Sequence, residues 1–356
     1  MLRRRTLVQL LIFALAGWTT AASGNATVRI MTQNMDAGTD QGYIIAALQG
    51  AMSLQDAVDL TYAELQASRL EQRAALLAYR IAQRQPDLVV LQEATLWRTG
   101  PGVNQATIPL FDQLFMLQMA LYRNQVPYRV VAVNTVFDVT LPGNQIPALR
   151  FTDRDALLVR TGKHPAHVDL SNVQTHIFDA SFPFGPFNLT AGWISAEVGL
   201  REWRFQLFAT HLQSAVAGIP QATQVQVAQA QQLLEAAGGV TGPVVICGDF
   251  NSDANDNPAV LDYTPTADLI RAAGYADVWQ AIHGSDPGNT WPLYLEDQIP
   301  QAFPPASPVE RIDILFARGL QNLGGNRILG PAPQGLAPPF ESDHAGVIAT
   351  FGAPKP

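Results

Sequence analysis

The chain has 356 residues, of which 47% are hydrophobic and 15% charged, with a formal net charge of −8 and a single cysteine. This composition is globular and excludes a disordered chain, and one cysteine excludes both an internal disulfide framework and a multi-cysteine zinc site. Only two lysines occur, Lys163 and Lys355. A tight, non-specific nucleic-acid binder is therefore not favoured, although net charge leaves a local basic cleft open.

The first 24 residues are predicted to be a secretory signal peptide. A basic segment at Arg3–Arg5 precedes an apolar segment at 7–18 and then small residues that offer a cleavage site. The alternative is an uncleaved membrane anchor, and amino-terminal sequencing of secreted material would distinguish the two. We expect a secreted or periplasmic protein, and loss of the three leader arginines would take the net charge from −8 to −11. No other stretch is long and apolar enough to cross a bilayer.

The rest of the chain alternates between apolar runs typical of strands and Ala-, Leu- and Gln-rich segments with helical spacing. No internal repeat or change of composition divides it. We therefore expect one domain over 26–352 and a short tail at 353–356. In chain order, strands are expected at 28–32, 87–91, 129–140, 155–160, 191–198, 204–210, 244–248, 311–317 and 346–351, and helices at 43–84 (one or two), 108–124, 221–237 and 266–273.

The most informative segment is PVVICGDFNSDANDN, which begins at Pro243. Its continuous apolar run, Val244–Gly248, indicates a buried central strand. Asp249 and Asn251 follow at the carboxyl end, where open α/β sheets place their ligands, and residues two apart on an extended chain point the same way. This pair is suited to positioning a water and a phosphate oxygen, and the alternative is a simple Asx turn.

The same pattern, an apolar strand that ends in a polar residue, recurs along the chain. Strand ends in one sheet share an edge, so these side chains could converge on one site. Carboxylates, a carboxamide and water suit a hard cation such as Mg²⁺ or Mn²⁺, while histidines supply acid–base and phosphate-stabilising chemistry. The residues concerned, besides Asp249 and Asn251, are Asn34, Asp36, Glu93, His211, Asp343 and His344.

An ordered set of six motifs carries a resemblance to a known family. QNMD, LQEA, THLQS, GDFNS, RIDIL and SDHAG occur in that order between Val28 and Phe351. The set resembles the endonuclease/exonuclease/phosphatase superfamily, which includes deoxyribonuclease I, exonuclease III-type abasic endonucleases, bacterial neutral sphingomyelinases and inositol polyphosphate 5-phosphatases. The resemblance implies a four-layer α/β sandwich of the αββα type, in which two packed mixed β-sheets are flanked by helices.

The resemblance also implies a metal site. Glu93 would be the principal metal carboxylate and would be helped by Asn34. Asp36 or Asp343 would ligate directly or through water, although the N-x-D sequence around Asp36 is also compatible with a turn. The implied cofactor is Mg²⁺, with Mn²⁺ or Ca²⁺ as alternatives.

The remaining motif residues would perform the chemistry. By resemblance, Asp249 orients or deprotonates the attacking water and Asn251 holds a phosphate oxygen. His344, oriented by Asp313, contacts the phosphate in the transition state, and His211 acts as a general acid or electrostatic aid. A structural alternative for Asp313 is an ion pair with Arg311 in the same strand.

Three further positions leave alternatives open. Arg154 and Asp155 are either a substrate-contacting pair or a surface ion pair. Trp291 either lines the cleft or packs beneath it. Gln224 and Gln226 stand where many relatives carry arginine, which puts polyanionic substrates in doubt.

These patterns predict a secreted, divalent-metal-dependent phosphoesterase, expected to be a monomer, that hydrolyses a phosphodiester by in-line attack of water. An extracellular nuclease ranks first, and a sphingomyelinase-like phospholipid phosphodiesterase or a phosphomonoesterase is the alternative. The substrate would then be a nucleic acid or a phospholipid headgroup. A non-catalytic binding protein on the same fold predicts a lost site residue, and none of the main ones is lost. A serine hydrolase is disfavoured because no G-x-S-x-G motif occurs.

Overall fold

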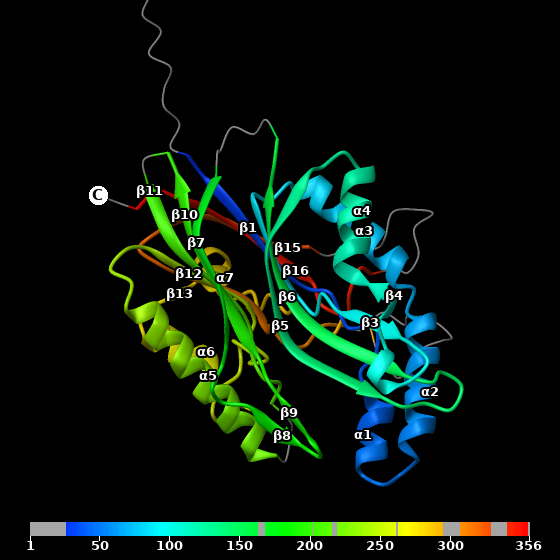
Figure 1. Ribbon diagram of the computed structural model, residues 1–356. Coiled ribbons are helices and arrows are strands. Elements are labelled where there is room, and N and C mark those ends of the chain that lie inside the picture. The colour runs from blue at the N-terminus through cyan, green and yellow to red at the C-terminus, as the bar shows by residue number, and fades with distance from the viewer. Residues whose placement is uncertain are drawn as a thin grey trace, which may run out of the picture.

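The computed structural model describes residues 26–162, 168–201, 203–215, 219–260, 263–294, 307–328 and 340–354. The predicted signal peptide and both lysines lie outside these residues. Two β-sheets pack face to face, and helices cover their outer faces (Figure 1). The predicted αββα sandwich of two mixed sheets is therefore confirmed. Among the described residues, no helix is both long and apolar enough to cross a membrane.

The first sheet has eight strands in the order β15-β16-β1-β2-β6-β3-β4, with β5 also paired to β6. Strands β1 and β2 run parallel, while β1–β16 and β2–β6 are antiparallel, so the sheet is mixed. Its strands are β1 (Val28–Asn34), β2 (Leu88–Gln92), β3 (Leu96–Thr99), β4 (Ile108–Asp112), β5 (Tyr128–Leu141), β6 (Leu149–Arg160), β15 (Gln321–Ile328) and β16 (Gly346–Gly352).

The second sheet has six strands in the order β13-β14-β12-β11-β10-β7. The pair β11–β12 is parallel and the other pairs are antiparallel. A separate hairpin is formed by β8 (Phe182–Phe184) and β9 (Phe187–Leu189). The six strands are β7 (Val168–Ile177), β10 (Gly192–Leu200), β11 (Trp203–His211), β12 (Val244–Asp249), β13 (Ala276–Asp277) and β14 (Asp313–Arg318).

The main core lies between the two sheets. Ile30, Val90 and Leu157 of the first sheet meet Leu207 and Val245 of the second in one buried cluster. Every second residue of a strand points to the same face of its sheet. Polar residues at the strand ends therefore face the other sheet when they lie an even number of positions from these core residues. Full burial on both faces explains the continuous apolar run of β12.

Helices form the two outer layers. Helices α3 and α4 cover the first sheet, while α5 and α6 cover the second (Figure 1). The helices are α1 (Gly42–Leu48), α2 (Leu54–Ala67), α3 (Leu70–Arg84), α4 (Gln113–Arg123), α5 (Pro220–Gly238), α6 (Thr266–Ala272) and α7 (Val278–His283), with one 3₁₀ turn, η1 (Val103–Gln105).

Two helix predictions differ from the structure. The segment 108–124, expected to be one helix, begins with strand β4, and α4 starts only after Asp112, whose carboxylate accepts a hydrogen bond from Phe115 N. Pairing of β4 with β3 decides the conformation of its apolar residues. The segment 43–84 contains three helices rather than one or two, because Ser53 caps α2 and Arg69, in the left-handed region, separates α2 from α3.

Candidate active site

The polar strand ends converge from both sheets, so the expectation of a single shared sheet edge was wrong. Asn34 ends β1 in the first sheet, whereas His211 and Asp249 end β11 and β12 in the second. They meet because β1 packs directly against β12 and β14. The site is a cleft of about 1180 Å³ between the sheets. Seven of the nine predicted site residues line it: Asp36, Glu93, His211, Asp249, Asn251, Asp343 and His344.

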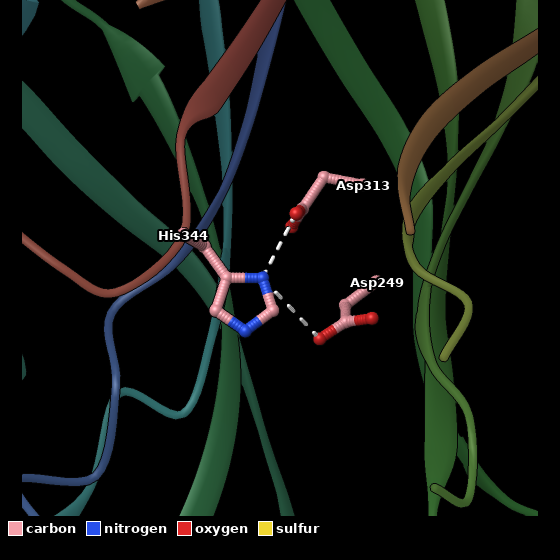
Figure 2. A group of neighbouring side chains, drawn as sticks. All are labelled: Asp249, Asp313 and His344. Carbon is pink, nitrogen blue, oxygen red and sulfur yellow. Dashed lines mark hydrogen bonds and ion pairs between the residues drawn. The ribbon is translucent and has the colours of Figure 1, made fainter. Parts of the chain in front are cut away.

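His344 and Asp313 form a buried pair (Figure 2). His344 Nδ1 lies 2.8 Å from Asp313 Oδ2 and 3.9 Å from Asp249 Oδ2. Because a carboxylate only accepts, Nδ1 donates to Asp313, and this fixes the ring orientation and leaves Nε2 for another partner. The alternative ion pair of Asp313 with Arg311 does not form, since Arg311 binds Asp277 at 2.7 Å.

The environment of His344 favours its charged form. Burial opposes the charge, but Asp313 and then Asp343 outweigh it, so the pKa of His344 is raised well above its ordinary value. Asp249, Asp313 and His344 each place one possible ligand atom within 4.8 Å of the others. Asp313 Oδ1 has no hydrogen-bond partner among the described residues. The Nδ1–Asp313 bond is the interaction expected of an oriented acid–base histidine.

Asp249 and Asn251 form an Asx turn and also place polar side chains at the site, so both arrangements expected from the sequence occur together. Asp249 Oδ1 accepts a hydrogen bond from Asn251 N at 2.9 Å, which makes an Asx turn. Asp249 Oδ2 accepts from Asn34 Nδ2 at 2.9 Å and faces both histidines. The carbonyl of Asn251 accepts from Gln226 Nε2 at 2.7 Å. The turn therefore supports the polar pair rather than replacing its chemistry.

His211, at the end of β11, lies close to Asp249 and Asn251. Its Nε2 is 3.6 Å from Asp249 Oδ2 and 3.2 Å from Asn251 Nδ2. The Asn251 amide donates to Leu212 O at 2.9 Å, so its approach to Nε2 does not oblige the imidazole to be neutral. Burial opposes the charge on His211, but Asp249 and neighbouring carboxylates outweigh it and raise its pKa to about 9. His211 is therefore protonated near neutral pH.

Oxygen donors suited to a hard cation also line the cleft. Glu93 accepts one hydrogen bond at each oxygen, from Asn34 Nδ2 at 2.8 Å and from Ala37 N at 2.7 Å. Its backbone has a φ of 51°, an uncommon conformation for a non-glycine residue that Asp36 and Asn251 at the same site also adopt. Asp343 Oδ2 accepts from Trp291 Nε1 at 2.7 Å, and burial raises the pKa of Asp343 to about 7.

The cleft offers oxygen ligands of the kind that a divalent cation prefers. Glu93 and Asp343 line it with carboxylates, and Asn34 Nδ2 donates to both Glu93 and Asp249, while Asn34 Oδ1 accepts from Asp36 N at 2.8 Å. A bound cation would also relieve the buried negative charge of Asp343.

Asp36 occupies a different environment from the other predicted ligands. Arg73 Nη2 lies 2.7 Å from Asp36 Oδ2, the Tyr294 hydroxyl donates to the same oxygen, and Gly38 N donates to Oδ1 at 2.6 Å. Arg73 is itself buried and donates to Met35 O. These contacts order the loop after β1 and leave the predicted role of Asp36 as a direct ligand without geometric support.

Two carboxylates on β6 lie at the site, of which Asp153 was not predicted and Asp155 was considered only as a substrate-contacting partner of Arg154. Asp153 lines the cleft, and Asp155 is 2% exposed with neither carboxylate oxygen bonded within the described part of the chain. Burial raises the pKa of Asp153 to about 6 and that of Asp155 well above its ordinary value. Asp153, Asp155 and Leu157 lie on the same face of β6, and Leu157 faces the second sheet. This alternation could have predicted that both carboxylates point toward the site.

The open alternatives are decided by these contacts. Arg154 pairs with Asp112 at 2.6 Å, so Arg154 and Asp155 do not act as a pair. Trp291 lines the cleft and also holds Asp343. Gln224 lines the cleft, whereas Gln226 is fully buried behind Asn251.

Comparison with known proteins supports the same grouping. Residues 31–344 match the family model described as "Endonuclease/Exonuclease/phosphatase family". The structure resembles endonuclease/exonuclease/phosphatase proteins from Beutenbergia cavernae (TM-score 0.56, 20% identity, covering 92% of this chain and 72% of that one) and from Bacteroides thetaiotaomicron (0.55, 13%, 93% and 99%). It also resembles TDP2 from Caenorhabditis elegans (0.51, 17%, 92% and 74%). At these identities the likeness establishes the fold. No curated protein is significantly similar in sequence.

Proposed function

Because the chain belongs to the endonuclease/exonuclease/phosphatase family, we propose that it is a divalent-metal-dependent hydrolase that cleaves a phosphodiester by in-line attack of water. The observation that carries the proposal is the His344–Asp313 pair facing Asp249 in a cleft that also holds Glu93 and Asp343. This arrangement combines an oriented histidine, a carboxylate for the water and oxygen donors for a cation.

Each side chain has a role that follows from its contacts. Asp249, held by Asn34, orients the water and accepts its proton. His344, charged and fixed by Asp313, binds a non-bridging phosphate oxygen through Nε2. His211, charged near neutral pH, donates a proton to the leaving oxygen. A bound cation supplies neutralisation of the phosphate charge.

The test is hydrolysis of bis(4-nitrophenyl) phosphate with Mg²⁺ or Mn²⁺, with and without chelator. We expect Glu93→Gln and His344→Gln each to lower kcat by roughly 10³-fold or more while the fold is retained. Glu235→Gln, an exposed position on α5, is the matched control and should leave kcat unchanged. Full activity in the presence of chelator, or in either site variant, would contradict the mechanism.

We also propose that the protein acts outside the cytoplasm. The support is the predicted signal peptide at 1–24. The check is detection of the processed chain, lacking these residues, in the periplasm or culture medium. An uncleaved chain recovered with membranes would favour the anchor instead.

A further inference from the structure

We propose that the cleft selects compact phosphodiesters whose organic groups are uncharged or cationic, and that it excludes polyanions such as duplex nucleic acid. This inference rests on the proposed function and names the substrate class for the same site. It favours a substrate such as a choline-type phosphodiester, free or as a lipid headgroup, over the nucleic acid that sequence reasoning ranked first.

The charge of the cleft is predominantly negative. No lysine or arginine occurs among the described residues that line it, and its basic groups are the two histidines assigned to the reaction. The segments of 26–354 outside the described residues contain one lysine, Lys163, and no arginine. Apart from Asp36, which pairs with Arg73, and the proposed cation ligands Glu93 and Asp343, the carboxylates that line the cleft are Asp40, Asp153, Asp249, Asp253, Asp256 and Glu310.

This charge balance is sufficient for one phosphate but not for several. The reacting phosphodiester carries one negative charge, which His211, His344 and a cation offset. Any further phosphate of a polymer would lie against carboxylates, and like charges brought together weaken binding. Proteins that bind nucleic acid instead place Lys and Arg along the phosphate backbone.

One side of the cleft is bordered by the β8–β9 hairpin and α1. The β8–β9 hairpin points toward α1 (Figure 1), and the space beside Gly185 at its tip is filled by the Leu48 side chain of α1, 3.3 Å from where a Cβ would stand. Gln41, just before α1, and Leu189, at the end of β9, both line the cleft. The hairpin and helix therefore contact each other at this side of the cleft, where a bulky substrate would meet both.

The same lining contains aromatic residues. Phe137, Phe151, Tyr263 and Trp291 are among the residues that line the cleft. Aromatic faces attract cations, and the effect adds to that of nearby carboxylates. An ammonium-bearing organic group therefore meets favourable surroundings where an additional phosphate does not.

The experiment compares kcat/KM at fixed ionic strength for 4-nitrophenyl phosphorylcholine, bis(4-nitrophenyl) phosphate, the 4-nitrophenyl ester of thymidine 3′,5′-bisphosphate, and duplex DNA. We expect the choline ester to exceed the bisphosphate ester by about 10-fold or more and DNA to be cleaved poorly. Equal or faster turnover of the bisphosphate ester or DNA would overturn the inference. Inactivity on all four would instead overturn the proposed function.

Two substitutions test whether the charge of the cleft causes this selectivity. Gln224→Arg adds a cation to the cleft, and we expect it to raise kcat/KM for the bisphosphate ester about 3- to 10-fold without helping the choline ester. Gln221→Arg, exposed on the same helix but outside the lining, is the matched control. An equal gain in both variants, or none in Gln224→Arg, would contradict selection by the cleft charge.

The source of a choline-type substrate is distinguished by comparing glycerophosphocholine with phosphatidylcholine and sphingomyelin vesicles. Release of phosphocholine from vesicles alone identifies a lipid headgroup, and turnover of the soluble ester alone identifies a free metabolite-sized substrate. Either result supports the inference, whereas cleavage of neither, together with efficient DNA cleavage, would oppose it.

Discussion

At the residue scale, the site owes its chemistry to how each titratable group is held. His344 donates to Asp313 through Nδ1, while His211 has no such fixed carboxylate bond and instead faces Asp249 at 3.6 Å. The first is an oriented, charged group suited to binding a phosphate oxygen. The second is free enough to pass its proton to a leaving oxygen. The resemblance implied the Asp313 partner of His344, whereas the contacts of His211 with Asp249 and Asn251 came only from the structure.

Asp313→Asn tests the orientation of His344. We expect kcat to fall roughly 10²- to 10⁴-fold with little change in KM, because the amide cannot stabilise the imidazolium or hold the same tautomer. The imidazole pKa of His344, followed by NMR, should fall in the same variant. Asp286→Asn, an exposed carboxylate outside the cleft lining, is the control. An unchanged His344 pKa would show that Asp313 does not hold it.

The pH dependence of stability follows from the same groups. The folded pKa of His211 is about 9 and exceeds the unfolded value near 6.5, so its contribution is present below pH 6.5 and is lost as pH rises through 9. The folded pKa of Asp343 is likewise raised, from 3.8 to about 7. Protonation of Asp343 therefore stabilises the folded state at low pH, and this stabilisation is lost as pH rises through 7. We therefore expect the Tm of metal-free protein to fall between pH 6 and pH 9.

The check is thermal unfolding in chelator across this range. Each group alone can contribute a slope of at most about 1.4 kcal/mol per pH unit. His211→Gln should flatten the decline between pH 7 and pH 9. A Tm that stays constant or rises with pH in the metal-free protein would refute this account.

At the element scale, the parallel pair β11–β12 fixes the position of Asp249. Gly248 has a φ of 149°, and a Cβ at this position would lie 1.8 Å from Thr210 O on the neighbouring strand. Only glycine allows this close approach of the two backbones. The requirement explains why a glycine interrupts an otherwise apolar strand immediately before the catalytic carboxylate.

Gly248→Ala should therefore destabilise the protein by about 3 kcal/mol or more, because either the backbone or the β11–β12 pairing must shift. Denaturant unfolding measures the change. Gly238→Ala, at the end of α5 with open space around it, should lie close to wild type. Similar stability of the two variants would show that β11 and β12 can separate at no cost.

At the scale of the whole molecule, the site exists only because two sheets pack face to face. The carboxylates proposed to hold a cation come from segments far apart in sequence: Glu93 follows β2 and accepts from Asn34 at the end of β1, and Asp343 lies in the loop before β16. Binding of a cation there would tie together the first and last strands of the first sheet, which are adjacent through the β1–β16 pairing. Metal binding should therefore stabilise the entire fold.

We expect Mg²⁺ or Mn²⁺ to raise Tm in a concentration-dependent manner. At a metal concentration of 100 times Kd, the free energy of unfolding should increase by roughly 2.7 kcal/mol. Glu93→Gln should remove most of this gain. Glu71→Gln, an exposed position on α3, should retain it. Equal stabilisation of wild type and Glu93→Gln by the metal would place the cation elsewhere.

Most of the buried strands and the polar residues at their ends could be predicted from the sequence, because burial on both faces leaves a continuous apolar run and a ligand site leaves polar residues at its end. The fold class followed from the resemblance carried by the ordered motifs. Less apolar strands such as β7 and β15, and the β4–α4 boundary, carried no such signal, since pairing with neighbours decides their conformation.

The way in which those residues contact one another depends on the three-dimensional packing of the chain. The packing of two sheets, rather than one sheet edge, brings Asn34 and Glu93 to Asp249. The same packing pairs Asp36 with Arg73 and Tyr294 and buries Asp155. It also lines the cleft around the proposed phosphate site with carboxylates. Contacts between residues remote in sequence depend on packing in three dimensions, and spacing along the chain does not encode them locally.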